Sequence, residues 1–190
     1  MDSDEDWTPE SLRAMPEPAY TDDTIVKFVK DYVPAGRVLD LGCGTGKWIG
    51  LWLKNNYQIE GYDQCPKAIE LAKQRFPTVP FHLGRAQSLP FKSEFDLIYT
   101  IAVLQHNRHA YKDTIIEEIK KALKPQAYYL MSENVLRKDN WHYTGRTEPF
   151  NEENSTDGYS YTYAGWIRFF DSHNIKLTKF EWPFFLFKVS

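Results

Sequence analysis

The chain has 190 residues, which is enough for one domain with a sizeable core. Its formal net charge is −3, and four acidic residues in the first six positions account for that excess, so the rest is nearly neutral and lacks the basic surface that duplex DNA requires. No apolar run approaches the roughly 18 residues of a membrane span, and two cysteines are too few for a disulfide framework. We therefore expect a cytoplasmic domain at residues 20–190, behind an acidic arm at residues 1–19, with no membrane partner.

The hydrophobic pattern predicts helices and strands in alternation. Strands are expected at residues 37–41, 58–63, 79–83, 95–100 and 127–133, and helices at 21–32, 47–53, 66–76 and 111–123. The links between them are short, which favours a doubly wound, mostly parallel sheet. A further helix at 164–172 precedes two strands at 175–182 and 184–189, and the single residue Pro183 between these strands allows only an antiparallel hairpin.

Residues 136–163 fit no helix or strand, and their polar sequence is interleaved with aromatic residues. A stretch of this length inside a compact domain is usually functional or disordered. Because it follows a strand, it should emerge at the carboxyl edge of the sheet, where ligands bind in such folds. We expect a lid over the substrate; a solvated, variable loop is the alternative.

Residues 38–46 read Val-Leu-Asp-Leu-Gly-Cys-Gly-Thr-Gly, an apolar strand that runs into a glycine turn. Glycine lets the backbone turn tightly and approach a ligand, and the N–H groups of the helix that follows would face that ligand. The dinucleotide fingerprint is not met, because its third glycine would fall on Lys47. The phosphate-binding P-loop is not met either, because its first glycine would fall on Leu41.

An aspartate followed by G-x-G-x-G after a strand resembles the class I S-adenosylmethionine-dependent methyltransferases, and the resemblance covers roughly residues 20–190. It implies a Rossmann-like sheet closed by a final antiparallel strand, S-adenosylmethionine as the cofactor, and methyl transfer to an oxygen or nitrogen acceptor. Two alternatives stay open. A catalytically silent S-adenosylmethionine-binding subunit would keep every motif, and a NAD-dependent oxidoreductase would share the fold, although the missing third glycine counts against it.

The resemblance also assigns cofactor contacts to the first turn. Asp40 would help to hold the amino group of the methionine portion, and Lys47 is a candidate for its carboxylate. The turn backbone would contact the same portion at Gly42, Cys43, Gly44 and Gly46.

Asp63 lies 21 residues beyond Gly42 at the end of the second strand, where a carboxylate suits the ribose hydroxyls. A cap for the next helix is the alternative role. Gln64 would lie beside the adenine or the ribose.

The adenine end is expected in the loop at residues 84–91, which carries the Leu-Pro-Phe of the family. Arg85 stands where the family usually has an acidic residue, and arginine has no hydrogen-bond acceptor. Adenine would then be recognised by the backbone at Arg85 and Ala86, by the Gln87 side chain, or by stacking of Arg85 on the ring. After the fourth strand, Thr100 and Ile101 are expected under the methionine portion and the transferable methyl group.

Methyl transfer needs alignment and exclusion of water, and it needs a base only if the nucleophile carries a proton. His106 follows the fourth strand and is the predicted catalytic base or substrate-orienting group; a histidine that only caps the loop is the alternative. His142 and Tyr143 in the presumed lid are further candidates, and Glu133 could hold an amine substrate.

Several specialised methyltransferase patterns are absent from the sequence. It has neither the Asp-Pro-Pro-Tyr motif of DNA-adenine enzymes nor a cysteine after the fourth strand for attack on cytosine, and we expect no metal because no carboxylate cluster is visible. The acidic, aromatic-rich carboxyl third favours a small or cationic acceptor, since aromatic faces attract cations. Protein and RNA acceptors stay open, as does the oligomeric state.

Overall fold

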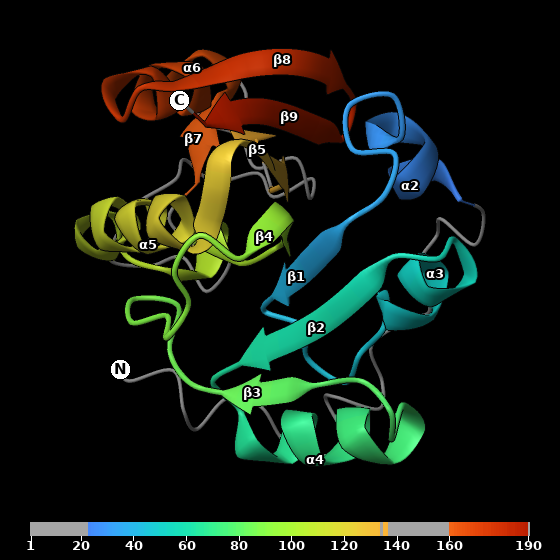
Figure 1. The fold of residues 1–190 in the computed structure, drawn as a ribbon. Helices are drawn as coiled ribbons and strands as arrows, with labels where there is room; N and C mark the ends of the chain where they lie inside the picture. Colours follow the sequence, from blue (N-terminus) through green and yellow to red (C-terminus); the bar gives the residue numbers. More distant parts are fainter. Residues whose placement is uncertain (1–22, 134, 137–159, 190) are drawn as a thin grey trace.

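A seven-stranded sheet runs through the centre of the molecule, with helices on both of its faces (Figure 1). The computed structural model describes residues 23–133, 135–136 and 160–189. The predicted arm at residues 1–19 and most of the predicted lid therefore lie outside the described residues. Within the described ranges, none of the helices combines the length and apolar character that crossing a bilayer requires.

Helices and strands alternate along the first half of the chain. The elements are α2 (Thr24–Val29), β1 (Arg37–Leu41), α3 (Ile49–Lys54), β2 (Gln58–Asp63), α4 (Pro66–Arg75) and β3 (Phe81–Leu83). The second half contains β4 (Phe95–Ile101), the 3-10 turn η1 (Leu104–His106), α5 (His109–Ala122), β5 (Leu123–Ser132), β6 (Val135–Leu136), β7 (Tyr161–Thr162), α6 (Tyr163–Ser172), β8 (Ile175–Glu181) and β9 (Phe184–Val189).

The strand order is β3-β2-β1-β4-β5-β9-β8, and the order reverses where β1 adjoins both β2 and β4. Strands β1 to β5 pair in parallel, whereas β9 pairs antiparallel with both β5 and β8. The hairpin turn joins Glu181 to Phe184, as the position of Pro183 predicts. The expected doubly wound sheet with a final antiparallel strand is confirmed.

Alternate residues of each strand face two separate cores. In β1, Val38 packs with α2, α3 and α4, whereas Leu39 and Leu41 face α5 and α6 on the opposite side. Both faces are therefore covered, which explains why the central strands read as continuous apolar runs. Each fully buried aliphatic or aromatic side chain contributes about 1.5–3 kcal/mol to this packing.

Strand β5 begins four residues earlier than its sequence predicts. Pro125 argues for a start at residue 127, because proline cannot donate to a strand ladder. Instead Phe95 pairs with Leu123 and Leu97 with Tyr128, so the ladder is interrupted around Pro125 by a bulge. Gln126, with φ of 63°, is the left-handed residue of that bulge. Because the ladder is interrupted there, the missing N–H of Pro125 is tolerated.

The pair β6–β7 is also unpredicted, since two-residue strands carry no periodicity. It places Leu136 and Tyr161–Thr162 in a small parallel ladder, and Tyr163 opens α6. The segment expected to lack structure is therefore shorter at both ends than residues 136–163. Residues 137–159, with His142 and Tyr143, lie outside the described residues.

Candidate functional site

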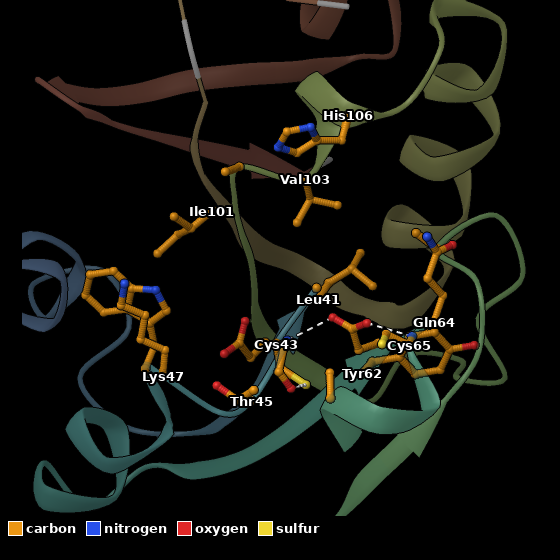
Figure 2. Close-up of a pocket in the computed structure, with 18 of the residues that line it drawn as sticks. Leu41, Cys43, Thr45, Lys47, Tyr62, Gln64, Cys65, Ile101, Val103 and His106 are labelled. Atoms are coloured by element: carbon orange, nitrogen blue, oxygen red, sulfur yellow. Dashed lines mark hydrogen bonds between the residues drawn. The ribbon is translucent and has the colours of Figure 1, made fainter. Parts of the chain in front are cut away.

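A pocket of about 380 Å³ opens at the carboxyl ends of β1, β2 and β4, where the strand order reverses (Figure 2). This is the position at which doubly wound sheets bind ligands, and the volume suits a nucleoside-sized molecule. Figure 2 shows His106, Val103 and Ile101 on one side of the pocket, facing Cys43, Thr45 and Lys47 on the other. We call these sides the β4 wall (residues 101–107) and the glycine wall (residues 40–48).

Most of the residues predicted to contact a cofactor lie around this pocket. They are Asp40, Gly42, Cys43, Gly44, Lys47, Asp63, Gln64, Ala86, Gln87 and Ile101, together with the predicted catalytic residue His106. Three predicted residues do not line it, namely Gly46, Arg85 and Thr100.

Ten further lining residues were not predicted. They are Leu41, Thr45, Trp48, Tyr62, Cys65, Ala68, Gly84, Ala102, Val103 and Asn107. Most of them lie next to a predicted residue along the chain. They could have been predicted from their closeness in sequence to Asp63 or to the glycine turn. The contribution of Val103 and Asn107 depends on how the chain turns after β4, for which the sequence carries no motif.

Two glycines of the turn are needed for different reasons. Gly44 has φ of 52°, and a Cβ added there would meet only open space, so its backbone conformation alone favours glycine. At Gly42, with φ of 84°, an added Cβ would lie 2.3 Å from Cγ2 of Val103, so the glycine and β4 walls approach closely there. Gly46 instead packs against Phe76 at the end of α4 and serves the fold rather than the pocket.

Asp63 joins the end of β2 to two neighbouring segments. Its Oδ2 accepts a hydrogen bond from the N–H of Gly44 at 2.8 Å, and its Oδ1 accepts one from the N–H of Cys65 at 2.8 Å (Figure 2). Burial raises the pKa of Asp63, and these backbone N–H groups oppose that shift. A carboxylate oxygen accepts more than one hydrogen bond, so Asp63 retains acceptor capacity toward the pocket.

Asp40 lies at the base of the pocket and is only 2 % exposed. Burial raises its pKa to about 7; the Tyr99 hydroxyl opposes this shift and the charge of Asp63 adds to it. Its Oδ2 has no hydrogen-bond partner among the described residues. Because this oxygen is buried beneath the pocket surface, a cation bound in the pocket would stabilise the ionised carboxyl group by charge attraction.

The β4 wall is held from below by Glu133, which is 4 % exposed. Its Oε1 accepts from the N–H groups of Val103 and Leu104, both at 3.0 Å, and its Oε2 accepts from that of Gln105 at 3.1 Å. These bonds contradict the expectation that Glu133 holds an amine substrate, because its carboxylate is directed at the backbone of the turn.

Thr100 is fully buried, and its hydroxyl lies 2.6 Å from that of Tyr129 and 3.2 Å from Oε1 of Glu133. Thr100 therefore does not line the pocket, and its side chain supports Glu133; that Thr100 lies under the cofactor stays a prediction. Thr100 is buried, whereas the next residue along the strand, Ile101, lines the pocket. The sequence does not show at which of the two residues the pocket begins.

At the end of the pocket where adenine is predicted, Gln87 and Asn107 connect the loop after β3 to the β4 wall. Nε2 of Gln87 donates to Oδ1 of Asn107 at 3.1 Å, and Nδ2 of Asn107 donates to the carbonyl of Val103 at 2.8 Å. Arg85 is exposed and does not line the pocket, whereas Ala86 and Gln87 do. Of the three predicted modes of adenine recognition, stacking of Arg85 has the least support.

His106 is solvent-exposed at the end of η1, and its Nε2 lies 3.4 Å from Nε2 of Gln105. The structure therefore brings the predicted base to the rim of the pocket. Among the described residues, no three His, Cys, Asp or Glu side chains converge as metal ligands would. That no metal takes part remains a prediction.

Comparison with known proteins agrees with this geometry. A family model described as a methyltransferase domain matches residues 38–126. An uncharacterized methyltransferase of Synechocystis is 33 % identical over 109 residues, 57 % of this chain and 51 % of the relative. A probable tRNA methyltransferase 9B of Mus musculus is 34 % identical over 103 residues, 52 % of this chain and 22 % of the relative. The chain thus spans about half the length of the first relative and less of the second.

Among solved structures, the S-adenosylmethionine-bound amino pentose methyltransferase CalS10 of Micromonospora echinaspora superposes with a TM-score of 0.74. It covers 95 % of this chain and 94 % of its own at 15 % identity, which establishes a shared fold. Fold and pocket define an α/β domain with a nucleoside-sized cavity at the carboxyl edge of its sheet. Residues 38–126 are therefore similar to methyltransferase domains, and the chain shares its fold with a methyltransferase whose structure holds S-adenosylmethionine.

The residues present fit that cofactor. The unsatisfied Oδ2 of Asp40 offers an anion for its ammonium and sulfonium charges, and Asp63 offers acceptors for a ribose diol. At Gly42, a larger residue would clash with Val103 in its present position.

Proposed function

We propose that this chain transfers a methyl group from S-adenosylmethionine to an oxygen or nitrogen atom of a small molecule. The observation that carries the proposal is the buried, unsatisfied Oδ2 of Asp40 beside the glycine turn, because it complements a cation at the base of a nucleoside-sized pocket. When bound, the cofactor supplies a methyl group already activated by its sulfonium.

The residues of the pocket then have four tasks. Asp40 and the glycine backbone hold the cationic methionine portion, and Asp63 holds the ribose. Val103 and Ile101 exclude water from the centre of the pocket. His106, at the rim, orients the acceptor and takes its proton if the acceptor atom carries one.

A small-molecule acceptor is favoured by charge and by similarity. The chain is nearly neutral beyond its first residues, which gives a polyanion little attraction. The amino pentose enzyme, which shares the fold over 95 % of this chain, acts on a small molecule. The tRNA methyltransferase 9B relative keeps an RNA acceptor as the competing outcome.

Two measurements test the proposal. Calorimetry should detect binding of S-adenosylmethionine and none of NAD; binding of NAD instead would support an oxidoreductase and overturn the proposal. Radioactive methyl transfer should then be screened against separate pools of metabolites, peptides and RNA. We expect S-adenosylhomocysteine and labelled product with the metabolite pool.

Label in the RNA pool alone would replace the proposed acceptor class while keeping the enzyme. Cofactor binding with no S-adenosylhomocysteine in any pool would support the silent binding subunit. Asp40→Asn, which keeps the size of the side chain, is the matched variant and should bind S-adenosylmethionine more weakly in the calorimetric arm.

A further inference from the structure

A buried carboxylate binds the centre of the β4 wall. Glu133 follows β5, and its two oxygens accept hydrogen bonds from three consecutive backbone N–H groups, those of residues 103–105, and from the hydroxyl of Thr100. The residue is 4 % exposed, so these bonds are shielded from water and stronger than they would be at the surface.

The wall needs this support because its backbone is irregular. Ala102 lies in the left-handed region with φ of 56°, which is uncommon for a residue with a side chain. In the three-residue turn η1 that follows, the first N–H groups have no acceptor within the turn, as at the start of any helix. Without Glu133, the N–H groups of residues 103–105 would lack the acceptor that the structure gives them.

The position of the wall in turn shapes the pocket. Val103 approaches the glycine wall closely enough that Gly42 could not carry a Cβ, and His106 and Asn107 line the same cavity. A shift in this turn would alter both the cofactor space and the location of His106.

We propose that Glu133 is a positioning residue: it fixes residues 103–107 as a wall of the cofactor pocket and so sets cofactor affinity and the placement of His106, touching neither. That the ligand is S-adenosylmethionine rests on the proposed function above, whereas the role of Glu133 in holding residues 103–105 does not depend on it. Glutamine cannot replace it. A carboxamide has one accepting oxygen and one donating NH₂, so whichever way it turns, a backbone N–H faces a donor.

Glu133→Gln tests the proposal, with Asp96→Asn as the matched control. Asp96 also accepts a backbone N–H, that of Arg37 at 2.8 Å, but at the opposite end of β4, away from the pocket. Hydrogen exchange should be measured without ligand, and S-adenosylmethionine binding by calorimetry. In Glu133→Gln we expect exchange at residues 103–105 to quicken about tenfold and the affinity to weaken about tenfold, whereas Asp96→Asn changes neither.

Unchanged exchange at residues 103–105 would overturn the proposal, as would faster exchange spread evenly over the whole sheet. If Glu133→Gln does not fold, Thr100→Val serves instead, because it removes one of the four hydrogen-bond donors to Glu133. We then expect a smaller, local increase in exchange at the amides of residues 103–105, and the absence of any increase would overturn the proposal. If the wild-type chain binds no S-adenosylmethionine, the proposed function fails, while the exchange comparison still decides the role of Glu133.

Discussion

The two walls of the pocket are built in different ways. The glycine wall is specified locally: Asp40, the glycines and Asp63 lie within one strand–turn–helix–strand unit, and Asp63 binds the turn through the N–H of Gly44. The β4 wall has no motif and is held by Glu133, which lies after another helix and another strand. The glycine wall is therefore determined by residues close together in sequence, whereas the β4 wall takes its position only when strands distant in sequence have paired.

The largest effect is expected where the two walls meet. Gly42→Ala should abolish measurable cofactor binding, because its Cβ would lie 2.3 Å from Cγ2 of Val103 and the backbone would be strained by about 1–3 kcal/mol. Calorimetry and thermal unfolding measure both terms. In thermal unfolding, Gly44→Ala is the control for backbone strain without a clash, since no protein atom lies within 4 Å of its added Cβ.

Adding Val103→Ala to Gly42→Ala should recover part of the binding by removing the clash. If the double variant binds no better than Gly42→Ala, the contact between the walls has no part in affinity, and the two walls act on the cofactor independently.

A smaller loss is expected within the glycine wall. Asp63→Ala should weaken S-adenosylmethionine binding by about 1–3 kcal/mol, because charge-assisted bonds to the ligand and the bond from Gly44 are both lost. Asp63→Asn keeps one accepting oxygen and should lose less. Equal affinity for wild type and Asp63→Ala would remove Asp63 from the ribose contact.

The pH dependence of binding should report on Asp40. Its pKa of about 7 means that the carboxyl group is mostly neutral at pH 5.5 and half ionised at pH 7. A cation binds the ionised form, so affinity should rise about tenfold across that range, with proton uptake by buffer visible in calorimetry. Asp40→Asn should flatten the profile, and an equally steep profile in that variant would assign the proton elsewhere.

The same raised pKa has an opposite effect on the protein without ligand. Burial disfavours the charged form, so the contribution of Asp40 to folding stability is largest below the unfolded value of 3.8 and falls as pH rises toward about 7. Thermal unfolding across that range, in wild type and Asp40→Asn, measures the difference.

The smallest effect on affinity is expected at the rim. His106→Ala should reduce turnover while leaving the dissociation constant for S-adenosylmethionine within about twofold, since a base acts on the acceptor rather than the cofactor. Turnover equal to that of wild type at every pH would leave His106 as a loop residue without a part in the chemistry.

The same contrast explains how much the sequence could reveal. Apolar runs and short links were enough for the doubly wound sheet, and Pro183 for the hairpin, because these signals act between neighbours in the chain. The bulge at Pro125 and the pair β6–β7 depend on distant strands, so they were missed.

In the site, the glycine motif and the strand-end position of Asp63 led to residues that line the pocket. Glu133 and Thr100 were given contacts with substrate and cofactor, yet their side chains bind each other, and Glu133 also binds the protein backbone. Residue type and place in the chain identify a carboxylate near a site, but the partner of that carboxylate is decided by packing between strands that are far apart in sequence.

The location of β9 bears on how the molecule is made. This strand, with its buried phenylalanines, lies between β5 and β8, and Tyr128 of β5 pairs with Lys188. During synthesis, β5 leaves the ribosome long before its neighbour, so its open side stays unpaired while some sixty further residues are translated. A nascent chain halted before β9 emerges should therefore bind chaperones. We expect it to dissociate from them only when β9 has paired between β5 and β8.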